Sequence, residues 1–456
     1  METRAPFVLP LALPLSNGGG SSITWPFDIA RKLAHRRGLS VLVSTDTSSP
    51  HGRRSFVACD PCDGAFGLDP LEGAVAPAHP GSDLAFAPAF IGVVPFEATR
   101  SRLERPAWSG PERRPSPPCG AIEWLRYDAV AVIDHEAETA HVVADDERAA
   151  LRLVREIEDG PARAPARFRL RVEEDEAGEE HVARVRDAIE RIFDGELYQV
   201  NLARRLRVSL QPNDPHAVLS AAEALLRAFP TAFGAVLRTA EGWVVSTSPE
   251  LLLDASPTPD GKAFERIATE PIKGTRRRAS DTDEDRALIS ELDADPKERA
   301  ELAMIIDVER NDVARVSIPG TTTIAKDPHV VTHRTLHHRV ARVEGVVRPG
   351  LSRADVLRSM VPSGSVTGAP KVRAMEIIAE LEPMRRGLYT GGIGYVGRDG
   401  STRLSMAIRT VVLDDDGEGE YLVGGGIVAD SIPERELDET RVKAAQLVAV
   451  SASKPA

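Results

Sequence analysis

Hydrophobic and polar positions follow different patterns in two parts of the chain. Up to about residue 165, short apolar runs alternate with Pro, Gly and charged residues, and these runs predict strands over residues 41–44, 55–59 and 129–134. Between residues 181 and 193, apolar side chains recur three and four positions apart, which predicts a helix ended by Gly195. The polar segment 156–180 separates the two patterns. We therefore expect an N-terminal region over residues 1–165 and a second domain over residues 180–451.

The second part of the chain alternates helical and strand patterns. They predict a helix over residues 215–229, strands over residues 233–237, 243–246 and 251–255, and a last helix over residues 433–450. Between them, Asp295 is placed as an N-cap, Pro296 fits the first helical turn, and Glu298 completes a pattern similar to a capping box. This helix is expected to run to about residue 308.

Composition limits the classes of function. The 456 residues carry 57 basic and 69 acidic side chains, a formal charge of −12, which argues against a surface for nucleic acid or anionic membranes. An anionic ligand would then need locally placed cations. Three cysteines are too few for a disulfide scaffold and suit a reducing compartment, so we expect a cytoplasmic protein.

Two apolar segments need a separate reading. Residues 7–15 have the look of a short signal peptide, but Pro10 and Pro14 interrupt them and no usual cleavage site follows, so a first strand is favoured. Residues 84–96 are broken by Pro88 and Pro95 and are too short to span a membrane.

A candidate nucleophile lies in the segment Pro271-Ile272-Lys273-Gly274-Thr275. Lys273 stands between an apolar residue and a glycine, after a strand-like run. A lysine pressed against a ligand loses its proton more readily than one in water, and can then act as a nucleophile. A surface lysine in a Pro-x-x-Gly turn gives the same pattern, and the pentapeptide alone does not separate the two.

Two predicted helices present carboxylates on one face. Glu298 and Glu301 are three positions apart, and Glu436, Glu439 and Lys443 are spaced three and four. One interpretation is solvated helix faces with ion pairs along each helix. The other is that Glu301 and Glu439 face each other across a cleft and hold Mg²⁺, which takes one or two carboxylates together with water and substrate oxygens.

Glycine clusters at residues 364–368, 391–394 and 424–426 mark places where backbone N–H groups can approach a carboxylate or phosphate. Tight turns between strands are the alternative. None of the clusters has P-loop or Rossmann spacing, so we reject nucleotide binding. Arg409 interrupts a strand-like run, and a buried arginine needs either a structural ion pair or a ligand carboxylate.

Zinc and redox roles are not favoured. The three histidines at positions 333, 337 and 338 match no familiar zinc spacing. Cys59-x-x-Cys62 has only Cys119 to join it.

Taken together, these motifs resemble the chorismate-utilising enzymes, the family of anthranilate synthase component I and aminodeoxychorismate synthase component I. The resemblance is strongest over residues 184–450. It rests on segments that stand in the family's order and spacing, namely residues 198–202, 248–250, 271–275, 295–312, 362–373, 407–410 and 424–443. The fold implied is α/β (α+β): two large antiparallel sheets packed as a sandwich with flanking helices. The N-terminal region would complete one edge of that sandwich, with the site in a deep cleft.

The resemblance also implies a substrate, chorismate, a cofactor, Mg²⁺, and roles for single residues. Glu301 and Glu439 are similar to the Mg²⁺ ligands, with Glu298 and Glu436 as water-mediated partners. Glu250 resembles the general acid that protonates the departing 4-hydroxyl, and His338 aligns with the family's active-site histidine. The implied substrate-binding set is Arg409, Tyr395, Gly425, Gly426, Thr275, Thr367, Gln199 and Lys443.

Two positions select a reaction within the family. Members that add water carry a lysine base where this chain has Gln199, and glutamine cannot deprotonate water. Anthranilate synthases usually have a small residue where Lys273 stands. The lysine resembles aminodeoxychorismate synthases, in which it is implicated as a nucleophile at ring C2. The implied product is 4-amino-4-deoxychorismate, the precursor of p-aminobenzoate and folate.

Other features bear on regulation and partners. Val43 replaces a carboxylate that is common at the family's tryptophan site, so the resemblance there is partial. All three cysteines lie in the first 119 residues and none stands in a glutaminase motif, so ammonia is expected from a separate glutamine amidotransferase subunit or from solution. The alternatives are anthranilate synthase component I and a non-catalytic subunit that binds a carboxylated ligand and regulates an amidotransferase.

Overall fold

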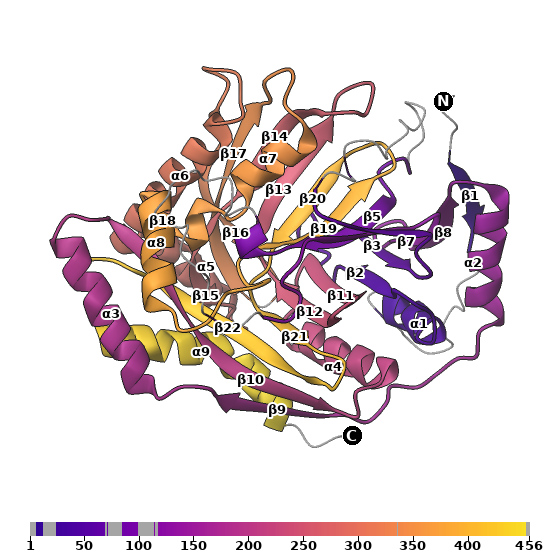
Figure 1. Cartoon of the computed structure of the whole chain (residues 1–456), viewed down its shortest axis with the longest axis horizontal. Coiled ribbons are helices and arrows are strands. Elements are labelled where there is room, and N and C mark those ends of the chain that lie inside the picture. Colours follow the sequence, from indigo (N-terminus) through magenta and orange to yellow (C-terminus); the bar gives the residue numbers. More distant parts are fainter. Residues whose placement is uncertain are drawn as a thin grey trace.

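The chain is built on two antiparallel sheets. The computed structural model describes residues 6–11, 24–68, 71, 84–98, 114, 117–334 and 336–452. Within these residues one sheet has 12 strands and the other has 10 (Figure 1). The expected pair of large antiparallel sheets with flanking helices is confirmed. Their facing side chains form a shared core in which Phe56 and Val130 of the first sheet meet Ile91 and Ile393 of the second.

Both sheets combine early and late segments of the chain. The larger sheet runs in spatial order through β1 (Phe7–Pro10), β8 (Thr139–Ala144), β7 (Ala129–Asp134), β3 (Arg54–Ala58), β2 (Ser40–Val43), β11 (Phe233–Thr239), β12 (Gly242–Ser248), β21 (Thr410–Leu413), β22 (Glu418–Ile427), β10 (Gln199–Gln211) and β18 (Gly368–Ala369), with β9 (Arg169–Glu174) paired to β10. The smaller sheet runs through β15 (Ile272–Arg277), β17 (Leu336–Val346), β14 (Phe264–Glu270), β13 (Leu251–Pro257), β20 (Thr402–Met406), β19 (Gly392–Gly397), β5 (Pro88–Val94), β6 (Glu123–Arg126) and β4 (Asp63–Phe66), with β16 (Thr323–Thr332) paired to β17. The described strands of residues 1–165 therefore occupy one end of both sheets, where the sequence predicted one edge of the sandwich. Residues 100–119, which are rich in Pro and charge and are expected from the sequence to form a surface loop, fall largely outside the described residues.

Helices cover the outer faces of the sheets. They are α1 (Trp25–Lys32), α2 (Glu147–Asp159), α3 (Gly178–Phe193), α4 (Pro215–Ala228), α5 (Thr282–Ala294), α6 (Pro296–Ala314), α7 (Arg353–Met360), α8 (Lys371–Leu381) and α9 (Pro433–Ala452), with a short 3₁₀ turn, η4 (Gly364–Val366). The larger sheet is covered by α1, α2, α4 and α9, while α6 packs on β17 and β14 of the smaller sheet. No helix in the described ranges is both long enough and apolar enough to cross a membrane.

Helix α6 begins where the sequence predicts and ends later. The Asp295 side chain caps it by accepting the N–H groups of Lys297 at 3.0 Å and Glu298 at 3.3 Å. The helix continues to Ala314, past the predicted end near residue 308. Its last turns are polar in sequence, but Glu309 and Asp312 are buried there, so the apolar periodicity used for the prediction fails.

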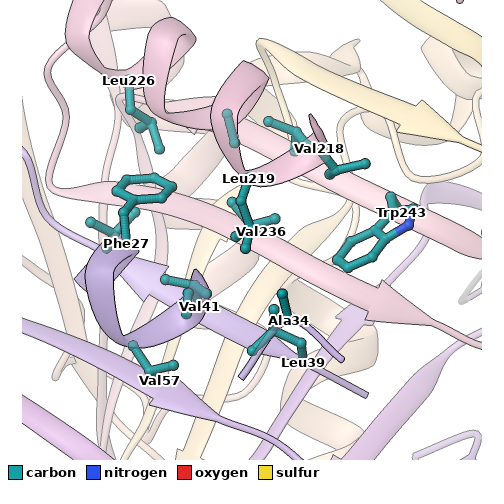
Figure 2. Close-up of a cluster of buried hydrophobic side chains, with 14 of the residues drawn as sticks. Phe27, Ala34, Leu39, Val41, Val57, Val218, Leu219, Leu226, Val236 and Trp243 are labelled. Atoms are coloured by element: carbon teal, nitrogen blue, oxygen red, sulfur yellow. The ribbon is translucent and has the colours of Figure 1, made fainter. Parts of the chain in front are cut away.

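A second core fills the space between the larger sheet and its helices. Figure 2 shows Phe27 of α1 and Leu226 of α4 above Val41 and Val236 of the sheet, with Trp243 beside them. Burying each large apolar side chain contributes about 1.5–3 kcal/mol. This packing fixes β2, β11 and β12 against one another, so the end of β12 has a defined position.

Two of the points at which the chain passes from one sheet to the other are neighbours. The chain leaves the larger sheet after β12 and enters the smaller one at β13, with Glu250 between them. It returns between β20 and β21, at Arg409. The sequence predicted a strand through Arg409, and this is wrong: the residue has a φ of 51°, because the backbone turns there from one sheet into the other.

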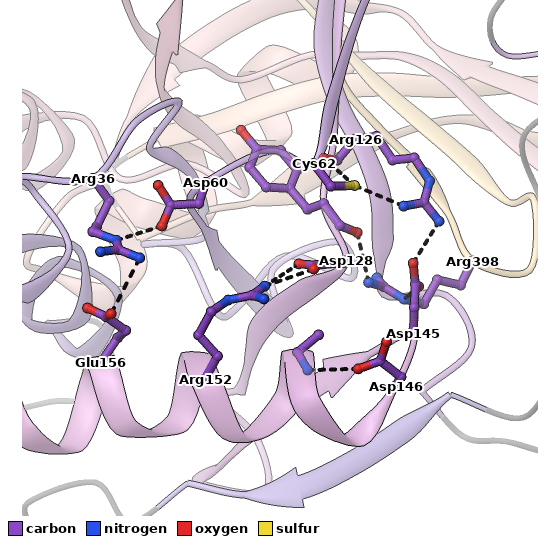
Figure 3. Close-up of polar contacts among 12 residues, drawn as sticks. Arg36, Asp60, Cys62, Arg126, Asp128, Asp145, Asp146, Arg152, Glu156 and Arg398 are labelled. Carbon is purple, nitrogen blue, oxygen red and sulfur yellow. Dashed lines mark hydrogen bonds and ion pairs between the residues drawn. The ribbon is translucent and has the colours of Figure 1, made fainter.

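A polar network attaches the N-terminal elements to the β19–β20 turn. Figure 3 shows Arg398 and Arg126 meeting at Asp145, which precedes α2. The Arg398 guanidinium is buried and lies 3.2 Å from Asp145 Oδ1, and it donates to the carbonyl of Tyr127 at 3.0 Å. Arg152 of α2 pairs with Asp128 at 2.7 Å in the same region.

We predict that Arg398→Ala lowers the free energy of unfolding by about 3 kcal/mol, because it leaves buried backbone carbonyls without their donor. Arg53→Ala is the control. The Arg53 side chain is 49% exposed and pairs with Asp134 at 2.8 Å, so its loss should cost less than about 1 kcal/mol. Urea unfolding of both variants measures the difference, and equal losses would contradict the assigned role of the network.

Candidate active site

The two crossovers are joined by backbone hydrogen bonds. The Met406 N–H donates to the carbonyl of Glu250 at 3.0 Å, and the Thr247 N–H donates to the carbonyl of Arg409 at 3.0 Å. The Thr247 hydroxyl donates to the same Arg409 carbonyl at 3.2 Å. Glu250 and Arg409, which are 159 positions apart in sequence, are therefore held side by side where the sheets meet.

Glu250 has the environment of a general acid. Its carboxyl is buried, and burial together with the neighbouring Glu309 raises its pKa to about 7. The Lys273 ammonium and a 3.4 Å hydrogen bond from the Ser365 hydroxyl oppose this rise. A carboxyl with a pKa near neutrality is protonated often enough to donate a proton at physiological pH.

Lys273 lies on β15, which pairs with β17. A bulge follows it, and Gly274 there has a φ of 77°. A Cβ at Gly274 would come within 2.7 Å of Leu292 Cδ1 and 3.0 Å of Glu298 Oε2, so only glycine allows α5 and α6 to approach this closely. The Lys273 ammonium lowers the pKa of both Glu250 and Glu439. The lysine therefore lies within the electrostatic reach of both groups.

The four predicted carboxylates come from two helices. On α6, burial and then the charge of Glu301 raise the pKa of Glu298. On α9, burial and then the charge of Glu439 raise the pKa of Glu436 despite a hydrogen bond from Ser431. Because Lys297 of α6 lowers the pKa values of both Glu436 and Glu439, the start of α6 lies close to α9.

Lysines supply the positive charge in this cluster. Lys443 Nζ lies 2.7 Å from Glu439 Oε1 and donates to the carbonyl of Gly424 at 2.9 Å, while Lys297 Nζ lies 3.7 Å from Glu301 Oε1. Burial alone would raise the pKa of Glu439. The ammonium groups of Lys443, Lys273 and Lys297 outweigh burial and hold this pKa below its ordinary value.

The donor chemistry suits a hard divalent cation, since four carboxylates gather where their charges repel. Among the described residues, however, no three His, Cys, Asp or Glu side chains are close enough to hold a metal ion. Lys443 and Lys297 supply part of the positive charge that a cation would bring. The predicted ligands interact as two pairs, Glu298 with Glu301 and Glu436 with Glu439, and their role as Mg²⁺ ligands stays a prediction.

His338 is buried on β17 beside Thr275. Its Nδ1 lies 3.1 Å from the Thr275 hydroxyl and 3.4 Å from the carbonyl of Gly274. Burial, His333 and the Arg409 guanidinium lower the pKa of His338 to about 3. The imidazole is therefore neutral at physiological pH, and it can orient a group by hydrogen bonding without adding charge.

Arg409 supplies the cation at the crossover. Burial lowers the pKa of its guanidinium, and Tyr421 and Glu250 act in the opposite direction. A structural ion pair of Arg409 is not seen among the described residues, and binding of a ligand carboxylate by Arg409 stays a prediction.

Gln199 of β10 lies beside Gly426 of strand β22, to which Gly425 also belongs. A Cβ at Gly426 would lie 3.0 Å from Gln199 Nε2, and that buried amide nitrogen has no hydrogen-bond partner. A Cβ at Gly425 would lie 3.3 Å from Glu436 Oε2 and 3.8 Å from Glu439 Oε1. The missing side chains therefore leave space beside the carboxylates. Thr367, by contrast, donates its hydroxyl to the carbonyl of Ser363 at 2.9 Å and stabilises the neighbouring loop.

The structure does not bring Tyr395 to this cluster, and this corrects the sequence reading. Tyr395 lines a separate cavity of about 360 Å³, in which its ring lies 5.3 Å from the ring of Phe56. None of the other predicted site residues lines that cavity. Alternation along β19 turns Tyr395 toward the N-terminal strands. Tyr389, six positions earlier, packs instead with Leu422 and Ile408, next to Arg409.

Sequence reasoning missed a group of buried polar residues behind Glu250. Glu309 and Asp312 of α6 meet Ser363 and Ser365 of the η4 turn, and Lys371 Nζ lies 2.7 Å from Asp312 Oδ2. The sequence did hold a signal for them, since these residues fall inside the motifs 295–312 and 362–373. Polar residues late in a helix are usually exposed, however, and the sequence alone does not show that these are buried. Only the packing of α6 against η4 shows that they are buried.

The remaining histidines and cysteines lie outside the cluster. His333 Nδ1 lies 2.6 Å from Asp46 Oδ2, and His337 Nε2 lies 2.9 Å from Asp285 Oδ1, so both hold neighbouring segments together. The three cysteines are unpaired, and Cys59 and Cys119 are buried with pKa values raised to about 12, chiefly by burial.

Comparisons with known proteins identify relatives with two different names. The chain is 40% identical over 330 residues to anthranilate synthase component 1 of Thermus thermophilus, covering 70% of this chain and 69% of that protein. It is 35% identical over 336 residues to aminodeoxychorismate synthase component 1 of Bacillus subtilis, covering 71% and 69%. Of several other relatives named anthranilate synthase component 1, the chain spans little more than half the length.

The fold has a solved counterpart. Anthranilate synthase component I from Streptococcus pneumoniae superposes with a TM-score of 0.72 at 26% identity, over 87% of this chain and 93% of that one. The family described as chorismate binding enzyme matches residues 67–449, which include every residue of the cluster above. The chain therefore belongs to the chorismate binding enzyme family.

Proposed function

We propose that this protein is an aminodeoxychorismate synthase component I, which converts chorismate and ammonia to 4-amino-4-deoxychorismate for p-aminobenzoate and folate biosynthesis. The observation that carries the proposal is the position of Lys273, whose charge acts on both Glu250 and Glu439. A nucleophile between the general acid and the carboxylates of α9 would stand beside a ring bound at Arg409.

The proposed reaction needs an acid and a nucleophile at once. After its ammonium group releases a proton to water, the Lys273 amine attacks ring C2, both ring double bonds shift, and the 4-hydroxyl leaves as water with the proton of Glu250. Ammonia then adds at C4, the double bonds shift back and the lysine departs. The nitrogen from ammonia gives up a proton as it becomes the product amine, which balances the proton consumed in forming water.

Binding falls to the groups around these two. The Arg409 guanidinium would pair with a substrate carboxylate, and the neutral His338 would orient the ring through hydrogen bonds, together with Thr275. Gly425 and Gly426 leave space for the ligand beside Glu436 and Glu439. Lys443 orients Glu439.

Mg²⁺ is the proposed cofactor, held by Glu301 and Glu439 with Glu298 and Glu436 as water-mediated partners. When bound, it would polarise the ring carboxylate of the substrate.

Anthranilate synthase component I is the second candidate. It is favoured by the names of several relatives, among them the Thermus thermophilus protein at 40% identity. The two reactions differ in where nitrogen enters the ring, C2 or C4. Isochorismate synthesis is disfavoured because Gln199 cannot act as a base toward water. A non-catalytic regulatory subunit would have no use for Glu250, Lys273, Glu301 and Glu439 in one cluster.

Ammonia would reach the site from a glutamine amidotransferase subunit, as component names of the relatives suggest, or from solution. We place the enzyme in the cytoplasm.

We predict that the purified protein, given chorismate, Mg²⁺ and ammonium, forms 4-amino-4-deoxychorismate, identified by mass with and without an added lyase. Lys273→Ala should lower this rate by about 100-fold or more, because the C2 nucleophile is lost. Lys262→Ala, at an exposed turn of the same sheet, is the control and should leave the rate unchanged. Fluorescent anthranilate formed without any lyase would overturn the assigned reaction. Full activity of Lys273→Ala would overturn only the role of the nucleophile.

We predict that chelation abolishes turnover and that added Mg²⁺ restores it. Glu439→Gln should raise the Mg²⁺ concentration for half-maximal rate by about tenfold or more, because one charged ligand is lost. Glu434→Gln is a matched control in the first turn of the same helix, where the side chain is 61% exposed. Equal Mg²⁺ dependence of the two variants would contradict the ligand assignment.

A further inference from the structure

Glu309 is a fully buried carboxyl without a counter-ion of its own. It lies on α6 with no exposed surface, and its Oε2 has no hydrogen-bond partner. The nearest buried cation, Lys371, is held 2.7 Å from Asp312 Oδ2 and also donates to the carbonyl of Pro362 at 2.8 Å. A buried carboxylate in this position is costly, so Glu309 needs either a proton or a partner with which to share one.

Two serine hydroxyls connect Glu309 to Glu250. The Ser363 hydroxyl donates to Glu309 Oε1 and lies 2.9 Å from the Ser365 hydroxyl. The Ser365 hydroxyl lies 3.4 Å from Glu250 Oε1, and its backbone N–H donates to Glu309 Oε1 at 3.0 Å. The four groups form one continuous chain, and all of them are buried.

The chain can be ordered in two directions. With the proton on Glu250, that carboxyl donates to Ser365, Ser365 donates to Ser363, and Ser363 donates to an ionised Glu309. With the proton on Glu309, every hydroxyl turns round and Ser365 donates to an ionised Glu250. In each arrangement both serine hydroxyls donate one hydrogen bond and accept another. Passing from one arrangement to the other carries one proton's worth of charge through three successive proton transfers.

We propose that Glu250 and Glu309 share one proton along the Ser363–Ser365 chain. Glu309 is then the positioning residue that keeps the Glu250 carboxyl protonated, so that it can act as the general acid. Two carboxyls that repel each other in a buried site hold one proton between them to a higher pH than either would alone.

The other charges around the pair support this assignment. Glu250 faces Glu309 from α6, the Lys273 ammonium from β15 and Arg409 from the second crossover. Glu309 faces Asp312 and Lys371, which are paired with each other. Burial is the largest cause of the raised pKa of each carboxyl, and both pKa values are raised to about 7.

This inference rests on the proposed function for its chemical purpose. When Glu250 gives its proton to the departing hydroxyl, forming water, Glu309 resupplies it through the two serines. The proton released from nitrogen as ammonia becomes the product amine then returns to the pair. The pair ends the cycle with the single proton with which it began.

The test is a pH titration of the free protein by difference infrared spectroscopy, which reports the C=O stretch of protonated carboxyls. In the wild type, a buried carboxyl should lose its proton near pH 7. Glu309→Gln keeps the shape and the acceptor but removes the negative charge that raises the Glu250 midpoint, so that midpoint should fall by about one pH unit. The basic limb of the pH profile for chorismate consumption should move down equally.

Two further variants separate charge, relay and fold. Ser365→Ala breaks the relay and keeps both carboxyls, so it should slow chorismate consumption by about tenfold at pH 7 while the variant remains folded. Glu123→Gln is the control. Glu123 is also buried, and its carboxylate accepts the backbone N–H of Ala240 at 3.1 Å. This variant should leave the midpoint of Glu250 unchanged.

An unchanged midpoint in Glu309→Gln, or the same shift in Glu123→Gln, would overturn the shared proton. Wild-type rates in Ser365→Ala would overturn the relay. If the product proves to be anthranilate, the proposed function fails, but the infrared titration still decides the shared proton because it needs no turnover. If Glu309→Gln does not fold, Glu420→Gln decides. Burial raises the pKa of Glu420 to about 7 as well, so with that carboxyl removed, loss of the remaining band near pH 4 contradicts the pair.

Discussion

The structure depends on the pairing of two chain crossovers between its sheets. A single strand that leaves one sheet for another exposes backbone donors and acceptors, which must be satisfied if they are buried. Here the segments around Glu250 and Arg409 satisfy each other through the Met406 and Thr247 N–H groups. The same two hydrogen bonds hold an acid beside a cation. The geometry of the candidate active site therefore follows from the need of buried backbone N–H and C=O groups for hydrogen-bond partners.

The second feature of the site is that it holds several carboxylates in partly buried positions. Helices α6 and α9 bring pairs of carboxylates together, and lysines partly neutralise them. Such an arrangement is costly for stability, since repelling carboxylates in a partly buried place raise one another's pKa values. The proposed Mg²⁺ would relieve this repulsion by adding positive charge between the carboxylates.

The N-terminal strands do more than extend the sheets. They contribute Phe56 and neighbouring residues to the cavity that contains Tyr395, on the other side of β19 from the segment carrying Tyr389. Buried Arg398 links the same region to Asp145 and to the carbonyl of Tyr127. The early and late parts of the chain are thus joined by packing and by polar contacts, and the catalytic cluster is built on a frame that both supply.

The sequence by itself determined much of this protein. Period-two and helical patterns located several helices and strands, Asp295 was identified as a cap, and the order of the motifs around Glu250, Lys273, Glu301 and Glu439 indicated the family. Local rules suffice for these features, because caps, turns and amphipathic faces depend on residues a few positions apart. Tertiary structure alone decided that Arg409 turns between sheets, that Tyr395 lies in a separate cavity, and that Glu309 is buried behind Glu250. These facts depend on contacts between residues far apart in the chain, where the polarity of a side chain does not reveal whether another element covers it.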